Sequence, residues 1–150
     1  MPDLARIDRI IDTWQGKQIA VLGDIMLDHY LWGEVERISP EAPVPVVEVL
    51  DETHLLGGAA NVALNLKKLG CAPVVLGIVG DDAAGRELSK LFSILGVDSF
   101  GVETVQYRPT TVKTRIIANN QQVVRADRED RREIDEDLQK RLLTKLKEKI

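Results

Sequence analysis

The sequence predicts an α/β domain with a mostly parallel sheet, flanking helices and a small β flap. Strand and helix patterns alternate along the chain, at residues 17–23, 57–70, 74–79 and 83–95. Such alternation favours a parallel sheet with helices packed on it. Two stretches, residues 30–50 and 110–126, do not fit this layer. We expect them to form an antiparallel flap beside the main sheet.

The first part of the chain predicts a helix, a buried strand and then extended structure. Residues 3–15 predict a helix whose apolar face consists of Ile7, Ile10, Ile11 and Trp14. Lys17–Gly23 predicts a buried strand. Prolines at positions 40, 43 and 45 exclude a helix from the next stretch, where nearby valines favour extended backbone.

Two adjacent glycines, Gly57 and Gly58, open a predicted helix that Gly70 ends. Glycine permits positive φ and lets a ligand approach the backbone closely. The free N–H groups at a helix start suit an oxygen-rich ligand. An ordinary strand–turn–helix junction would explain the pair equally well. We expect the helix to present an apolar face of Val62, Leu66 and Leu69.

The later segments predict a second helix over residues 83–95, a short strand within 97–105 and a last helix over 134–150. Asp81-Asp82 is expected to cap the helix at 83–95 rather than to catalyse. Asn119-Asn120 is a plausible hairpin turn inside the flap. The charge run from Asp127 to Glu133 indicates a solvated linker. Because the last helix reaches Ile150 without a cap, we expect a truncated domain.

Composition limits the function classes. The chain has 150 residues, a net charge of −4, one cysteine and two histidines. Bulk charge does not favour nucleic acid or an anionic membrane. Cys71 alone excludes an internal disulfide, and we expect no metal site. The N-terminus lacks an apolar signal core and no run could span a bilayer, so we expect a cytoplasmic protein.

Three polar residues are candidates for binding hydroxyl groups. Asp24 follows a strand at the position where open α/β sheets collect ligands, although a turn or cap role is also open. Asp28, four residues later, carries the same ambiguity. Asn61 offers a donor and an acceptor in the first turn of a helix, where capping is the alternative.

Two basic residues are candidates for binding a phosphate. Period-two alternation places Lys113 and Arg115 on one face of a flap strand. A solvated strand face is the alternative. Arg125 belongs to the partner strand, and its facing depends on a register that the sequence does not determine.

Taken together, these stretches resemble the ribokinase-like (PfkB) carbohydrate kinases. The matching motifs are Gly23-Asp24, Gly57-Gly58-Ala59-Ala60-Asn61 and Gly80-Asp81-Asp82-Ala83-Ala84-Gly85. Arg37-Ile38-Ser39-Pro40-Glu41-Ala42-Pro43-Val44-Pro45-Val46-Val47 is similar to the heptose 7-phosphate kinase module of bifunctional heptose kinase/adenylyltransferases. That module phosphorylates the anomeric hydroxyl of D-glycero-β-D-manno-heptose 7-phosphate on the route to ADP-heptose and lipopolysaccharide.

The resemblance implies a role for each candidate. The sugar would be bound by Asp24, Asp28, Gly57, Gly58 and Asn61. Its phosphate would be bound by Lys113, with Arg115 as the second candidate. Segments 30–50 and 110–126 would form the lid. The family's second motif, Gly-Ala-Gly-Asp, carries the catalytic base, and it does not occur in these residues. The resemblance therefore implies the N-terminal, sugar-binding half of a kinase, inactive alone and with no catalytic residue of its own.

The implied partners follow from that reading. ATP and Mg²⁺ would belong to the intact enzyme, together with a missing C-terminal half and a fused adenylyltransferase domain. We also expect a homodimer formed through the β lid, because exposed sheet edges favour association. Two alternatives stay open: another sugar or nucleoside kinase of the same family, and a non-catalytic binding or dimerisation module.

Overall fold

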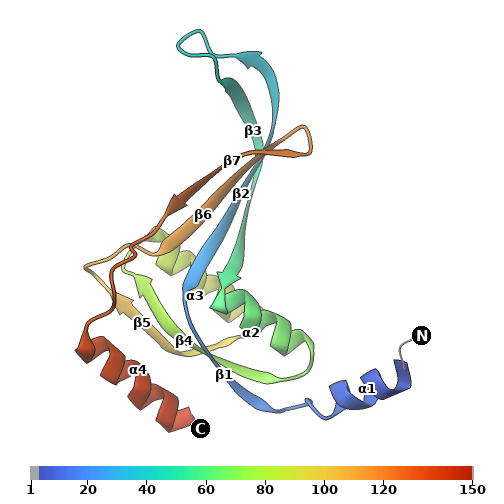
Figure 1. Ribbon diagram of the computed structural model, residues 1–150, viewed down its shortest axis with the longest axis vertical. Coiled ribbons are helices and arrows are strands. Elements are labelled where there is room, and N and C mark those ends of the chain that lie inside the picture. The colour runs from blue at the N-terminus through green and yellow to red at the C-terminus, as the bar shows by residue number, and fades with distance from the viewer. Residues whose placement is uncertain (1–3, 150) are drawn as a thin grey trace.

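Two β-sheets divide the chain between a helix-covered body and a projecting arm (Figure 1). The computed structural model describes residues 4–149. The body sheet is parallel and has the order β1 (Gln18–Leu22), β4 (Ala72–Gly80), β5 (Asp98–Val105). The arm, called the lid sheet below, has the order β3 (Pro45–Gly58), β2 (Ile25–Ile38), β6 (Thr111–Ala118), β7 (Gln121–Arg128). The helices are α1 (Leu4–Asp12), α2 (Ala59–Lys68), α3 (Ala83–Leu95) and α4 (Glu136–Lys149).

The body confirms the predicted parallel layer with flanking helices. Helices α2 and α3 pack on one face of the sheet, where Val75, Leu88 and Phe92 belong to the main core cluster. Helix α4 buries Leu138 and Leu142 beside Val105, in a separate cluster. Figure 1 places α4 away from α2 and α3, at the other side of the sheet.

The lid sheet corrects the prediction of an antiparallel flap. Hairpins β2–β3 and β6–β7 are antiparallel, but β2 and β6 pair in parallel. The reason is that β2 continues from β1 and β6 follows β5, so both strands leave a parallel sheet in the same direction. The lid strands also extend beyond the predicted segments, since β2 and β3 span residues 25–58 rather than 30–50 and β7 runs to Arg128 rather than to residue 126.

Helix α2 buries a different face from the predicted one. Val62 is 50% exposed and Leu69 38% exposed, whereas Ala59, Ala60 and Ala63 are buried. These alanines have no atoms beyond Cβ, so the helix lies close to the body, and a Cβ built on Gly23 would lie 3.4 Å from that of Ala59. The close approach of α2 to the body therefore determines which face of this helix is buried.

Several predicted stops and caps are confirmed. Gly96 ends α3 with φ 61°, and Gly70 follows α2 with φ 89°. Asn119 and Asn120 turn the β6–β7 hairpin with φ 49° and 62°. Positive φ at both central residues is the requirement of a type I′ turn. Helix α1 begins at Leu4, and residue 3 of the predicted helix lies outside the described residues, as does Ile150.

Asp82 caps α3 and also anchors the start of β6. Its Oδ1 accepts bonds from the Gly85 backbone N at 2.9 Å and from Thr110 Oγ1 at 2.7 Å. Its Oδ2 accepts from the Thr110 backbone N at 3.0 Å, and Thr110 is buried. Burial alone would raise the pKa of Asp82, but the hydrogen bonds from Thr110 and Gly85 outweigh it and hold that pKa below its usual value.

Within residues 4–149, no helix combines the length and the apolar character that crossing a bilayer would need.

Candidate functional site

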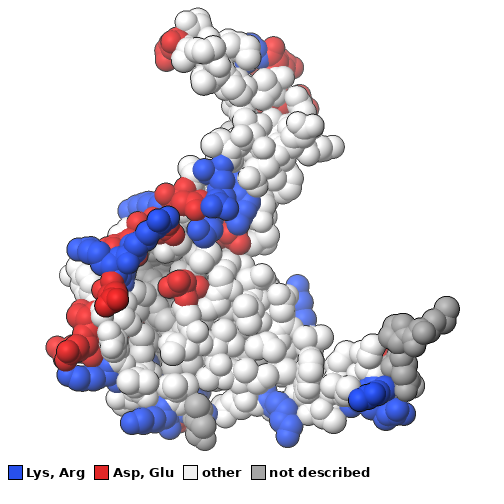
Figure 2. Space-filling view, viewed as in Figure 1, with Lys and Arg blue, Asp and Glu red and all other residues white. Residues whose placement is uncertain are grey.

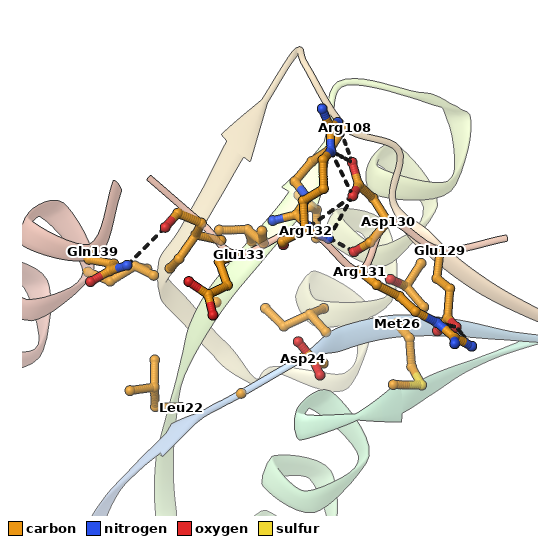
Figure 3. A pocket seen from close by; sticks show the side chains of 18 of the residues that line it. Leu22, Asp24, Met26, Arg108, Glu129, Asp130, Arg131, Arg132, Glu133 and Gln139 are labelled. Carbon is orange, nitrogen blue, oxygen red and sulfur yellow. Dashed lines mark hydrogen bonds and ion pairs between the residues drawn. The ribbon is translucent and has the colours of Figure 1, made fainter. Parts of the chain in front are cut away.

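A pocket of about 730 Å³ opens at the carboxyl end of β1, between the start of β2 and the segment that leads into α4 (Figure 3). Its volume is ordinary for a small-molecule site. The carboxyl ends of strands are where open α/β sheets bind ligands. Its polar lining comes mainly from Asp24, Arg108, Glu129, Asp130, Arg132 and Glu133.

Asp24 presents a free carboxylate to this pocket. Its side chain makes no hydrogen bond or ion pair with any residue in the described range 4–149, and Figure 3 draws it among the lining residues. Only its backbone O is engaged, accepting from Ala59 N at 2.9 Å. The N-cap of α2 is Gly58, with no side-chain cap bond, so the capping alternative for Asp24 has no support.

Gly57 and Gly58 bring the β3–α2 junction against the two aspartates. Gly58 has φ 56° and ψ −133°, and a Cβ placed there would lie 2.3 Å from the backbone O of Asp24. A Cβ on Gly57 would lie 2.8 Å from Asp28 Oδ2. Gly58 requires glycine, because its φ is positive and a Cβ there would collide with backbone, whereas a side chain at Gly57 would force the Asp28 side chain to shift. Asn61 lies exposed in the first turn of α2.

Asp28 and Arg115 form one ion pair across β2 and β6. Arg115 Nη1 donates to Asp28 Oδ1 over 2.6 Å, and both side chains are about one-fifth exposed. The hydrogen bond with Asp28 raises the pKa of Arg115 above its ordinary value. Arg115 also lies over the Tyr30 ring, 5.1 Å from its centroid. Neither charge is therefore as free as the one on Asp24.

Lys113 lies on the same face as Arg115, as expected, but its partners come from β7 and the segment after it. Its Nζ is 3.0 Å from Asp127 Oδ2 and 3.7 Å from Glu129 Oε2. The register that the sequence left open places Arg125 opposite Arg115. Arg125 Nε donates to Asp127 Oδ1 at 2.9 Å. Figure 2 shows acidic and basic side chains gathered together where β7 and the following segment cross the molecule.

Arg108 and Asp130 are pocket residues that the sequence reading missed. The Arg108 side chain is only 8% exposed, and its Nη2 donates to the backbone O atoms of Asp130 and Arg132, each at 2.7 Å. Hydrogen bonds from Arg132 hold the pKa of Asp130 well below its usual range. The predicted solvated linker over 127–133 agrees with the exposure of Arg131, Arg132 and Glu133, whereas Glu129 and Asp130 are half-buried. Asp130 is partly covered by Arg108, which lies 22 positions away in the sequence, so no local signal indicates this contact.

The carboxylates of the pocket that lack a protein partner suit a ligand rich in hydroxyl groups. Arg131 donates to Glu129 at 2.6 Å, and Arg132 donates to Asp130 at 3.0 Å. Each arginine of the lining therefore already has a carboxylate partner. The Asp24 and Glu133 carboxylates have no hydrogen-bond or ion-pair partner within the described residues. They can therefore accept hydrogen bonds from hydroxyl groups.

Comparison with known proteins agrees with this geometry. Residues 17–148 match the pfkB family carbohydrate kinase profile. The chain is 51% identical over 132 residues to the bifunctional protein HldE of Wolinella succinogenes, covering 88% of this chain and 28% of that protein. It is also 51% identical over 134 residues to the HldE of Helicobacter pylori J99, covering 89% and 29%. The chain thus spans less than a third of these relatives.

Solved structures share the fold. The chain matches Arabidopsis thaliana ribokinase, solved with ribose and ATP, at a TM-score of 0.57 and 21% identity, over 75% of this chain and 35% of that one. It matches a carbohydrate kinase from Agrobacterium tumefaciens at a TM-score of 0.58 and 23% identity, over 74% and 35%. The predicted ribokinase-like fold is therefore confirmed.

Proposed function

The chain belongs to the pfkB family of carbohydrate kinases, and we propose that it forms the sugar-binding part of an ATP-dependent sugar kinase. The observation that carries this proposal is the free Asp24 carboxylate at the end of β1. It lies beside the Gly57–Gly58 junction and the N-terminus of α2. A carboxylate can accept two hydroxyl hydrogen bonds, and a helix start supplies N–H donors. Together they suit a polyol.

The acceptor that we propose is D-glycero-β-D-manno-heptose 7-phosphate, phosphorylated at its C1 hydroxyl for ADP-heptose and lipopolysaccharide synthesis. Support comes from about 50% identity to the bifunctional HldE proteins over most of this chain, combined with the Ser39–Pro45 motif. Another sugar or nucleoside kinase of the family is the alternative. We place the reaction in the cytoplasm, where ATP is available.

In this scheme each residue of the site has a separate task. Asp24 and Asn61 bind sugar hydroxyls, and Gly57 and Gly58 let the sugar reach the backbone. The lid sheet covers the ligand and excludes water. Lys113 offsets the charge of the sugar's phosphate, and the Asp28–Arg115 pair fixes the sheet beside it.

ATP would supply the phosphoryl group, but the described residues do not fit a triphosphate. Arg108, Arg131 and Arg132, the cations of the pocket lining, are each already paired with a carboxylate. We therefore assign ATP, Mg²⁺ and the catalytic base to a part of the enzyme outside these residues.

A binding measurement tests the proposal. Calorimetry with heptose 7-phosphate, ribose and a nucleoside should give saturable binding that is tightest for the heptose. Asp24→Asn should weaken that binding by roughly 1.5–3 kcal/mol, the scale of a hydrogen bond to a charged group. The melting temperature of the Asp24→Asn variant should equal that of the native chain, because the Asp24 carboxylate has no protein partner. Asp12→Asn, at an exposed carboxylate of α1 outside the pocket lining, is the matched control and should bind as the native chain does.

Two outcomes would contradict the proposal. Absence of ligand-dependent stabilisation for every sugar would favour a purely structural module. A large loss of stability in Asp24→Asn with unchanged sugar affinity would show that the carboxylate stabilises the fold rather than binding the sugar.

We also propose that the lid sheet pairs with that of a second copy. Its outer strands β3 and β7 have free edges, and it exposes Ile38, Val49 and Val124 by 62%, 48% and 49%. Open edges and exposed apolar side chains favour association. Light scattering should give a dimer for the native chain and a monomer for Val49→Lys, and a monomer for both would refute this assembly.

A further inference from the structure

The chain's two histidines meet in the lid sheet, although 25 positions separate them. His29 of β2 and His54 of β3 lie directly opposite each other, with ring centroids 4.5 Å apart. Glu52 lies two residues before His54, on the same face of β3. His29 Nε2 is 3.5 Å from Glu52 Oε2, and His54 Nε2 is 3.8 Å from Glu52 Oε1. One nitrogen or oxygen from each residue lies within 4.8 Å of the others.

This cluster is separate from the sugar pocket. Successive side chains on a strand alternate between faces, so His29 lies on the opposite face of the lid sheet from Asp28. Leu27 and Leu56, two positions away on each strand, are both 3% exposed and belong to the core. The cluster thus lies next to the buried core residues Leu27 and Leu56, on the same face of the lid sheet. Its Glu52 side chain is half exposed to solvent.

One ring nitrogen of His29 is buried without a hydrogen bond. Among the side chains of residues 5–149, its Nε2 is the one buried nitrogen or oxygen without a hydrogen-bond partner. Buried polar atoms are almost always satisfied, so such an atom calls for a ligand or a cause. The other ring nitrogen, Nδ1, lies 3.4 Å from Thr114 Oγ1 on β6. That contact directs Nε2 toward Glu52 and His54.

We propose that His29, His54 and Glu52 form a zinc site. Two imidazole nitrogens and one carboxylate oxygen make a donor set that Zn²⁺ binds in proteins, with a fourth position left for water. Zinc lies about 2.0–2.2 Å from such ligands in a tetrahedron, so its ligand atoms stand about 3.4 Å apart. The separations of 3.5 and 3.8 Å to Glu52 are close to that value. Small side-chain rotations would complete the site.

A bound zinc ion would fasten β2 to β3 and, through Thr114, to β6. Ligand-orienting partners such as Thr114 fix the ring of a ligating histidine. The consequence is a stiffer lid sheet, independent of whether a sugar occupies the pocket on the other face. Because this assignment rests on the lid residues alone, it stands apart from the proposed kinase function.

The test is zinc titration of the untagged, chelator-treated 150-residue chain. We expect one equivalent of Zn²⁺ to bind, and the melting temperature to rise by at least about 4 °C at a hundredfold excess over Kd. His54→Gln should weaken binding by more than the roughly 10- to 100-fold typical of losing a ligand-orienting residue, and Thr114→Val should fall within that range. Glu48→Gln, an exposed carboxylate on the same strand, is the matched control and should bind as the native chain does.

Proton NMR of the native chain gives a readout that does not depend on any variant folding. Because the chain has only two histidines, both imidazole signals should change together and reach their end point at one equivalent of Zn²⁺. Binding that leaves either signal unchanged would overturn the site. So would equal affinity in His54→Gln, or the absence of binding to the native chain.

Discussion

Arg115 reaches across from β6 to hold Asp28 on β2, with Nη1 and Oδ1 only 2.6 Å apart. Two residues that the sequence nominated separately for sugar and phosphate binding are thus one ion pair. Its first role is to join the two lid hairpins, since β2 and β6 are the strands through which they meet.

The Asp28–Arg115 pair should therefore show energetic coupling. In a double-mutant cycle of Asp28→Asn and Arg115→Met, we expect a coupling free energy of about 1 kcal/mol, above the median for exposed pairs. Urea unfolding of the four proteins measures it. Strict additivity of the two substitutions would show that the pair contributes nothing to the lid sheet.

Lys113 should discriminate between phosphorylated and unphosphorylated sugars. Lys113→Met keeps the apolar stem and removes the charge that lies between Asp127 and Glu129. We expect heptose 7-phosphate to bind about tenfold more weakly or worse, on the scale of one charge-assisted hydrogen bond. Unphosphorylated heptose should be little affected, and calorimetry compares the two. Equal weakening of both sugars would transfer the phosphate role to Arg115 or Arg125.

Asp82 should give the fold an acid-sensitive contribution. Its folded pKa lies below the usual value, so it stabilises the protein above about pH 4 and the contribution is lost as the pH falls further. Asp82→Asn would turn an amide NH₂ toward a donor at Thr110, costing about 1–3 kcal/mol at pH 7. Between pH 7 and pH 3, the free energy of unfolding should fall less in Asp82→Asn than in the native chain. Asp81→Asn, at the neighbouring exposed carboxylate, should keep the native profile.

Gly58 should tolerate alanine far less well than Gly16. Both have positive φ, but a Cβ on Gly58 would lie 2.3 Å from a backbone oxygen, whereas one on Gly16 meets nothing within 4 Å. We expect Gly16→Ala to cost about 1 kcal/mol of stability and Gly58→Ala about 3 kcal/mol or more. Chemical denaturation measures both. Similar losses would mean that the junction can shift away from Asp24.

Local signals in the sequence indicated the elements and several of their ends, although the lid strands extend beyond their predicted ranges. Apolar periodicity indicated the body strands and α3, and Asp82, Gly96 and the Asn119-Asn120 pair each stop or turn the chain through their own backbone or side chain. Asp24 and the Gly57–Gly58 pair could be nominated because ligand sites in α/β sheets follow strand ends. The family resemblance brought the rest of the candidates together.

What the sequence left undetermined depends on contacts between distant segments. The parallel pairing of β2 with β6 follows from where β1 and β5 end, which no window of residues contains. The buried face of α2 depends on how closely three alanines approach the body. Arg108 gains its place only when Asp130 and Arg132 fold over it, and the meeting of His29 with His54 requires the exact hairpin register.

The parallel pairing of β2 with β6 also has a kinetic consequence, because it joins residues 85 positions apart. Each hairpin can form from local contacts. The pairing of β2 with β6 can form only after β4, α3 and β5 have folded between them. Non-local pairing of this kind slows folding. During that interval β2 and β6 each present an open edge, which a strand from another copy can occupy. We expect refolding yield to fall with rising protein concentration, with exchange of β6–β7 hairpins between copies as the competing product.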